Sequence, residues 1–343
     1  MKRTTRGLLV ILFSFILIFI TGCKNTTVSY TDPNTGEERE IKIEKTSTEQ
    51  EVADSIYAIA LSDTKIKDST ETMFDMDFDF NLKDLKNNDN TIINGSLLYS
   101  MKLKDGYPIT NDDNMYKAYE IYMKFSCKGS TKEDGKEYKV PQSIIELFVD
   151  DGMCYIKFDL DQAFVDLFED SGIRIEKIFK WYNGKVIWFD LKETLPVLGI
   201  PLDINIEDTS EMTVKELLEE YGSLTGEEIN LDNLRSDIDT IVKELGIKIT
   251  SVRGSEVTYQ IDISNYLTTL TKDATCLFFI TIDVQELSIS KFIVDIKIKN
   301  DDYDGTFKIE SNFQYKAKIT KISDSDKEIA VSGNINDFIN DYN

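Results

Sequence analysis

The sequence predicts an α+β protein built around a mainly antiparallel β-sheet. Long segments alternate apolar and polar residues with a period of two, which is typical of strands with one solvated face. Turn sequences such as Asp151-Gly152 and Asn183-Gly184 separate several of these segments, as they do in β-hairpins. Two other segments, residues 48–61 and 231–245, repeat apolar residues at helical spacing and predict amphipathic helices.

Residues 1–22 have the layout of a signal peptide. Three basic residues precede an apolar run over residues 8–20. This run is shorter than the roughly 20 residues that a transmembrane helix needs, which favours a signal peptide over an anchor. Ile20-Thr21-Gly22-Cys23 then resembles the lipobox of bacterial lipoproteins. The resemblance implies cleavage before Cys23 and lipid attachment to its thiol, with an ordinary secretory signal or an uncleaved anchor as the alternative.

The next segment, residues 23–47, lacks a core pattern and is expected to be a flexible tether. Turn-forming residues are dense in it, and one short strand is expected at 40–43. A single folded domain is expected over residues 48–343. It begins with the helix at 48–61, whose first residues Thr48-Glu49-Gln50-Glu51 have the spacing of a capping box.

Strands follow this helix. In residues 72–81, four large apolar side chains alternate with Asp75, Asp77 and Asp79, so the two kinds of side chain are expected on opposite faces. A hairpin is expected over Asp151-Gly152. The strands expected in this part of the chain are 72–81, 95–103, 119–127, 145–149, 154–160 and 185–191.

The segment at about 195–245 is expected to be helical. Thr213-Val214-Lys215-Glu216 has capping-box spacing, and residues 231–245 form a regular amphipathic pattern. Whether this segment covers the sheet or forms a separate subdomain stays open at this point. The C-terminal third then returns to strands, which are expected at about 247–252, 256–263, 276–285, 288–299 and 307–319.

The composition argues against several classes of function. The chain has no His among its 343 residues, which removes Ser-His-Asp triads and His-ligated zinc or haem. The 62 acidic residues outnumber the 39 basic ones and give a net charge of −23, which argues against binding to nucleic acid. The sequence contains no Gly-rich phosphate loop and no signature of a catalytic nucleophile. We therefore expect no enzyme activity, no cofactor and no metal site.

Three cysteines follow Cys23 in the sequence. Cys127, Cys154 and Cys276 each lie in an alternating apolar run, which favours small buried side chains. A disulfide between two of them is possible, and the sequence cannot select the pair. None has the Cys-x-x-Cys spacing of a metal or redox site.

The order of the elements and three stretches resemble the lipoprotein-carrier superfamily of LolA and the LppX-type lipoproteins. Residues 148–157 resemble its hairpin with an Asp-Gly-x-x-Tyr sequence. Residues 246–259 resemble a later strand pair with a Gly turn and a Tyr, and residues 276–299 resemble the long hairpin that follows. The resemblance implies a strongly curved sheet, a half-barrel, with helices packed over one face and an apolar cavity for acyl chains. The segment at about 195–245 departs from the smaller members of the superfamily.

The large apolar residues of the alternating strands are the candidate ligand-binding residues. They either line such a cavity or pack as ordinary core. The expected function is that of an extracytoplasmic lipoprotein, held at the cell membrane by its lipid, that binds or carries a lipid or another apolar ligand. The alternative is a structural or protein-interaction module of the cell envelope without a ligand cavity. The candidate residues are Phe74, Met76, Phe78, Phe80, Tyr99, Met101, Phe313 and Tyr315.

Overall fold

The computed structural model divides the chain into two compact units. Unit 1 consists of Met1–Ser69 and Asp208–Lys297, and unit 2 consists of Thr70–Glu207 and Ile298–Asn343. The structure describes residues 27–33, 35–62, 64, 71–104, 115–170, 176–198, 213–216, 233–267, 273–315 and 319–333. Cys23 and the expected signal peptide lie outside the described residues. Among the described residues, no helix has both the length and the apolar character that crossing a membrane requires.

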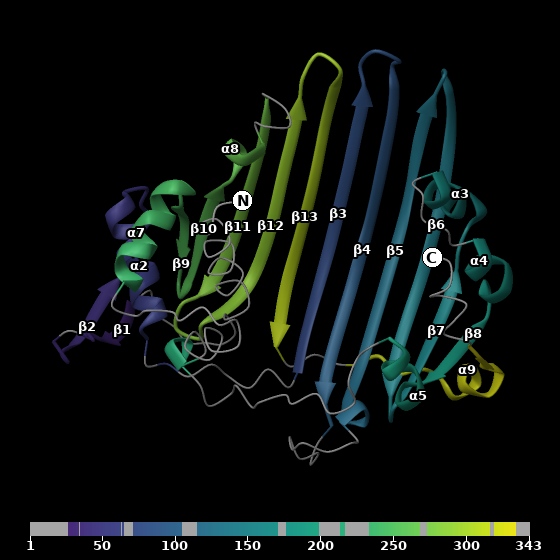
Figure 1. Cartoon of the computed structure of the whole chain (residues 1–343), viewed down its shortest axis with the longest axis horizontal. Coiled ribbons are helices and arrows are strands. Elements are labelled where there is room, and N and C mark those ends of the chain that lie inside the picture. Colours follow the sequence, from purple (N-terminus) through teal and green to yellow (C-terminus); the bar gives the residue numbers. More distant parts are fainter. Residues whose placement is uncertain are drawn as a thin grey trace. The chain divides into compact units, whose positions relative to one another are not determined.

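Unit 2 contains eight strands of a large sheet, in the order β14-β8-β7-β6-β5-β4-β3-β13 (Figure 1). Neighbouring strands are antiparallel except for the short β14, which pairs with β8 in parallel. The strands are β3 (Glu71–Asp84), β4 (Asp89–Leu103), β5 (Tyr119–Glu133), β6 (Lys136–Asp150), β7 (Met153–Asp159), β8 (Val186–Asp190), β13 (Tyr303–Tyr315) and β14 (Val331–Ser332).

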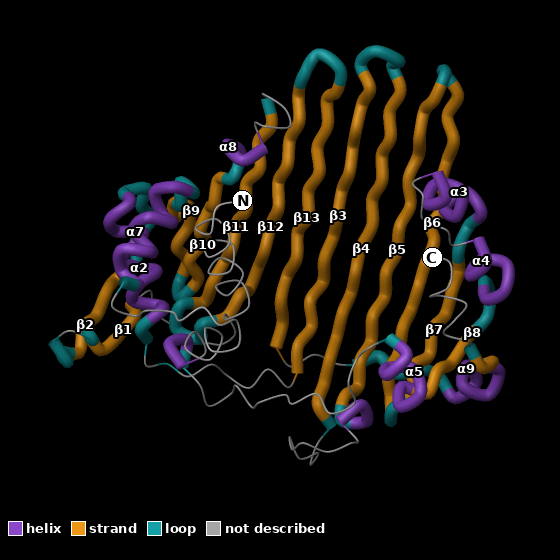
Figure 2. The backbone as a smooth tube through the Cα atoms, in the orientation of Figure 1, coloured by secondary structure: helices purple, strands orange, loops and turns teal. Residues whose placement is uncertain are grey.

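Unit 1 contains the other four strands of this sheet, in the order β12-β11-β10-β9. The strand order is linear, so the sheet is open and is not a closed barrel. Figure 2 shows that strands dominate the described chain and that the helices are short. The expected α+β fold with a mainly antiparallel open sheet is therefore confirmed. The strands are β9 (Lys248–Arg253), β10 (Glu256–Asp262), β11 (Ala274–Asp283) and β12 (Ser288–Lys299).

The helices of unit 2 gather at its β8 end. The unit contains η1 (Met115–Lys117), α3 (Gln162–Asp170), α4 (Glu176–Tyr182), α5 (Leu191–Val197) and α9 (Asp324–Ile329). Asp161 caps the start of α3, because its Oδ1 accepts a hydrogen bond of 2.9 Å from the backbone N–H of Ala163. Phe164 of α3 and Tyr182 of α4 are buried in one core cluster with Phe158 and Ile187 of the sheet. These two helices therefore cover the face of β6, β7 and β8 that the cluster occupies.

The segment around α9 packs on the opposite face of the same strands. Ile322 is buried there in a second cluster with Tyr122 and Phe148. Two ion pairs add to this contact, one of 2.9 Å between Lys157 Nζ and Asp326, and one of 3.2 Å between Lys327 Nζ and Asp150. Burial by itself would raise the pKa of Asp150, but Lys327 and Lys104 together lower it. Both faces of the β8 end are thus packed.

In unit 1, α2 (Glu49–Ala60) and α7 (Leu234–Glu244) pack against each other, and α2 contacts β9. Both helices confirm predictions made from helical spacing. The Ser55 hydroxyl lies 3.0 Å from the Tyr259 hydroxyl, which joins α2 to β10. The unit also contains the short helix α8 (Ser264–Leu267).

The expected flexible tether is instead structured over most of its length. β1 (Thr27–Thr31) and β2 (Glu38–Lys42) form an antiparallel hairpin. Val28 and Tyr30 are buried, and the Tyr30 ring lies edge-on to Tyr57 of α2 at 5.9 Å. The prediction of a flexible tether was wrong, because Val28 and Tyr30 among polar neighbours form too short an alternation to indicate a buried strand. Tertiary contact with α2 supplies the packing.

The two predicted capping boxes differ in outcome. At α2 the Glu51 carboxylate accepts hydrogen bonds from the Thr46 and Thr48 hydroxyls, which lower the pKa of Glu51, and the Thr48 side chain caps no backbone group. The second box forms as predicted. The Thr213 N–H donates to Glu216 Oε2 at 2.6 Å, and the Glu216 N–H donates to Thr213 Oγ1 at 3.2 Å.

The question of a disulfide is settled by the structure. Cys127, Cys154 and Cys276 are buried free thiols. Burial raises the pKa of all three, and that of Cys154 to about 12. The thiolate is the reactive form of cysteine, so a raised pKa makes these thiols less reactive. They serve as small core side chains, as the alternating pattern predicts.

Candidate functional site

The eight candidate residues all lie on one face of three neighbouring strands of unit 2. Strand β3 is central and pairs with β4 on one side and with β13 on the other. Because side chains alternate along a strand, the residues that share this face follow from the register. We call this surface the aromatic face. It consists of the even-numbered residues 72–80 of β3 and the odd-numbered residues 93–101 of β4 and 307–315 of β13.

Stacked and tilted rings join the three strands. Phe74 of β3 lies opposite Tyr99 of β4, with ring centroids 5.1 Å apart and an interplanar angle of 23°. The same ring lies 5.8 Å from Phe313 of β13. Further along, the Phe80 and Phe307 rings are 6.4 Å apart. Such pairs add about 0.5–1.5 kcal/mol each beyond the effect of burying their area.

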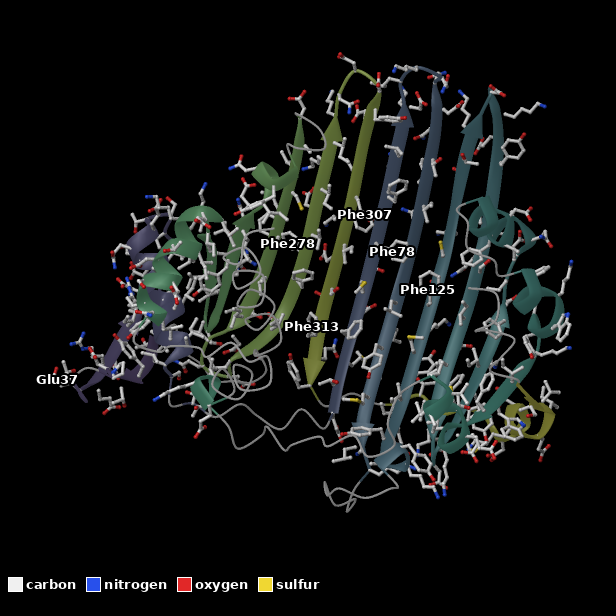
Figure 3. All side chains as sticks on the ribbon, in the orientation of Figure 1. Glu37, Phe78, Phe125, Phe278, Phe307 and Phe313 are labelled. Carbon is white, nitrogen blue, oxygen red and sulfur yellow. The ribbon has the colours of Figure 1, made fainter. Side chains whose placement is uncertain are left out.

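A glycine lets the aromatic face continue onto β5. Gly95 of β4 lies opposite Phe78, and a Cβ at Gly95 would overlap the Phe78 ring. The ring therefore lies over the Gly95 backbone and reaches Phe125 of β5, with centroids 5.9 Å apart and an interplanar angle of 14°. Figure 3 shows Phe78, Phe125, Phe307 and Phe313 along these strands. Sequence spacing could not identify the Phe78–Phe125 contact, because β4 lies between the two strands and the rings meet only when the registers of β3, β4 and β5 are set.

The aromatic face is only half-buried. Phe74, Met76, Phe78 and Phe80 all keep part of their surface in solvent. The residues that continue the same face toward β8, such as Phe158 and Ile187, are buried under α3 and α4. In the described part of unit 2, no helix lies over β13, β3 or β4 (Figure 1). The face is therefore a half-buried apolar surface that is continuous with the core.

The two faces of β3 differ sharply in charge. The aromatic face carries no charged residue at any of its positions. On the other face Asp75, Asp77 and Asp79 are exposed, as predicted from the alternation. Burial and then the charges of Asp75, Asp79 and Glu310 raise the pKa of Asp77. The strand thus separates apolar from acidic side chains completely over this length.

The acidic face includes a hollow of about 440 Å³ beside Asp77 and Asp79. The rest of its lining includes the hydroxyl and amide side chains of Ser96, Ser126 and Gln142 and the charged side chain of Lys128. Its Asp79 carboxylate accepts a hydrogen bond of 2.5 Å from Asn94. Among the described residues, no group of three or more His, Cys, Asp or Glu side chains is arranged to hold a metal ion.

Several members of the aromatic face were not among the candidate ligand-binding residues. Ile93 and Leu97 of β4 and Phe307 and Ile309 of β13 lie on it. Their signal was the same alternation that identified Tyr99 and Phe313. Cys23, the predicted lipid attachment site, lies outside the described residues.

Comparison with known proteins adds little to this description. No family model matches the chain, and no curated protein matches it. One similar solved structure is a beta-barrel-like protein of a domain of unknown function from Brucella abortus. It is 10% identical, covers 74% of this chain and 98% of its own, and has a TM-score of 0.13. That score is too low to support an argument about fold or function. These features define a class, an α+β protein with an open antiparallel sheet and a half-buried aromatic face.

Proposed function

We propose that this protein is a lipoprotein held at the extracytoplasmic face of the cell membrane by lipid on Cys23, and that its aromatic face binds a lipid or another apolar ligand. The observation that carries the proposal is the open apolar surface of β13, β3 and β4. Large contiguous apolar patches are rare on soluble monomers and usually mark an interaction site. The resemblance to the lipoprotein-carrier superfamily remains a prediction that agrees with this proposal.

The energetics favour a ligand made of hydrocarbon. Each methylene that moves from water onto an apolar surface contributes about 0.8 kcal/mol, so an acyl chain can bind without a polar contact. A chain of this acidity is repelled by an anionic membrane surface, so a lipid anchor is needed to hold it there. The anchor would also keep the aromatic face close to a source of lipid.

Two adjacent residues of β13 provide a matched test. The test uses a chain that is expressed from residue 23 onward, without the signal peptide, and that carries Cys23→Ser. This chain keeps every described residue and lacks the lipid. Phe313 lies on the aromatic face and Gln314 is exposed on the opposite one. A fluorescent fatty acid is titrated into Phe313→Glu and Gln314→Glu. We expect the first to weaken binding by at least about tenfold, because it places a carboxylate on the apolar surface, and the second by less than about twofold.

Circular dichroism checks that each variant is folded. If Phe313→Glu does not fold, Met76→Gln replaces it, because glutamine has a shape similar to that of methionine. Equal affinities of the matched pair would place the ligand elsewhere. If the unsubstituted chain binds no fatty acid at micromolar concentration and retains no lipid in native mass spectrometry, the proposal fails. The protein would then be the structural or protein-interaction module of the cell envelope.

A further inference from the structure

Within the aromatic face, hydroxyl groups occur in the rows of Thr72, Phe74 and Met76 and are absent from the rows of Phe78 and Phe80. We infer that it takes an amphiphile in one orientation, with the acyl chain over Phe78 and Phe80 and a hydrogen-bond-accepting head group beside Tyr99 and Tyr315. This inference rests on the proposed function and adds to it the class of ligand and its direction along the strands. Three observations support it.

The first observation is the hydrocarbon character of one end. Phe80 lies between Ile93 of β4 and Phe307 of β13, and Phe78 lies between Gly95 and Ile309. No side chain in these two rows has a polar atom. Beyond them, the hydroxyls of Thr91 and Thr131 lie 3.1 Å apart and bond to each other. The rows of Phe78 and Phe80 therefore offer only apolar contact, which suits an acyl chain.

The second observation is the group of hydroxyls at the other end. Thr72 lies between Met101 of β4 and Tyr315 of β13, and Tyr99 is in the row next to it. The Tyr99 hydroxyl donates to the Met101 sulfur at 3.5 Å. A thioether is a weak acceptor, so an ester, carboxylate or phosphate oxygen would replace it with a gain in hydrogen-bond strength. Burial raises the pKa of both tyrosines, so they remain protonated donors.

The third observation is a buried hydroxyl between the two ends. Ser311 lies on the aromatic face opposite Met76 and is 1% exposed. Its Oγ has no hydrogen-bond partner among the described residues. Leaving such a group unpaired is unfavourable, because its hydrogen bonds to water are lost without replacement. The unbranched Met76 side chain can move aside, and a carbonyl oxygen at the top of an acyl chain would then pair with the Ser311 hydroxyl.

The length of the aromatic face suits such a ligand. Residues 72 to 80 span eight steps of a strand, or about 27 Å. One leaflet of hydrocarbon is half of a core of roughly 30 Å, which is about 15 Å. The face therefore has room for a long acyl chain over the phenylalanine end and for a head group over the tyrosine end.

Nitroxide-labelled stearic acid tests the orientation. The label is placed near the carboxyl group in one probe and near the methyl end in the other. Reporter tryptophans are introduced as Phe307→Trp and Phe313→Trp in the processed Cys23→Ser chain, and the quenching of each variant is compared with that of the parent chain and its two native tryptophans. We expect the methyl-end probe to quench Phe307→Trp more strongly, and the carboxyl-end probe to quench Phe313→Trp more strongly.

The head-group contact is tested with Tyr99→Phe, which keeps the ring and removes the hydroxyl. We expect this change to weaken stearic acid binding by about two- to tenfold, the value of one hydrogen bond, and to leave the binding of a long-chain alkane unchanged. Tyr138→Phe, on an exposed tyrosine of β6, is the matched control and should change neither affinity.

The two proposals fail in different ways. If stearic acid does not bind to the parent chain, the proposed function fails. If it binds but both probes quench the two reporters equally or in the reverse order, or if Tyr99→Phe weakens alkane and stearic acid binding alike, the inferred orientation is overturned and the proposed function stands.

Discussion

In unit 2, side chains from the helices determine which part of the sheet is buried and which part is only half-buried. Phe164 and Tyr182 project from helices onto β6–β8 and bury the residues beneath them. Phe74 and Met76 have the same apolar character but remain half-buried, since no described helix covers their strand. Hydrophobicity alone therefore does not separate core from binding surface, because both kinds of residue follow the same alternation.

Asp77 provides a prediction at the residue scale. Its pKa is higher in the folded chain than in the unfolded chain, so the folded state binds more protons between the two values. The free energy of unfolding must then fall as the pH rises through this interval. Asp77→Asn removes the repulsion, and we expect a gain of up to about 0.5 kcal/mol at pH 7, kept small by solvent screening.

Urea titrations at several pH values measure this gain. It should disappear below the ordinary pKa of Asp, about 3.9, where the carboxylate is neutral in both states. Glu310→Gln serves as a second variant, because it removes one of the charges that raise the pKa of Asp77. A pKa of Asp77 that does not fall in Glu310→Gln would contradict this explanation.

At the scale of elements, turn chemistry sets the hairpin between β6 and β7. Asp151 and Gly152 both have positive φ, 51° and 79°, as a two-residue hairpin turn requires. The backbone then reverses within two residues and places Val149 opposite Cys154. The Asp-Gly sequence was therefore sufficient to predict this hairpin, because the requirement is local.

Two glycines allow the destabilisation caused by backbone strain to be distinguished from that caused by steric overlap. Gly152 and Gly184 have similar φ angles, 79° and 72°. A Cβ at Gly152 would lie 2.7 Å from the Tyr116 ring, and a Cβ at Gly184 would meet nothing within 4 Å. We expect Gly184→Ala to lower the free energy of unfolding by about 1–2 kcal/mol through strain, and Gly152→Ala to lower it further.

Chemical denaturation of both variants measures the difference. The double variant Gly152→Ala with Tyr116→Ala supplies the control, because its Cβ has no ring to meet. Equal losses for Gly152→Ala and Gly184→Ala would show that the contact with Tyr116 has no energetic weight.

At the scale of the whole molecule, the proposed lipid on Cys23 determines where the protein is held. Its acidic composition disfavours binding to an anionic membrane through charge. We expect the natural chain to stay in the membrane fraction after a high-salt wash, because hydrocarbon and not ion pairing holds it. Cys23→Ser should accumulate as an uncleaved and unlipidated precursor. Mass spectrometry of the N-terminal peptide checks the cleavage and the lipid on Cys23. An unmodified N-terminus at another residue would contradict this proposal.

The sequence by itself determined most of the strands, their faces and the helices α2 and α7. Side-chain alternation and helical spacing are properties of neighbouring residues, so Asp75, Asp77 and Asp79 could be placed on the face opposite Phe74 without any knowledge of the fold. The eight candidate residues share one face for the same reason.

Only the tertiary structure decided which strands and helices pack against those faces. The pairing of β3 with β13 joins residues more than 200 positions apart, and no local pattern specifies it. The hairpin of β1 and β2 is structured through its contact with α2, and the aromatic face is open because α3 and α4 lie over β6–β8 instead. Burial depends on which elements pack together. For that reason the sequence predicted the candidate residues, and the structure alone showed which of them remain accessible to a ligand.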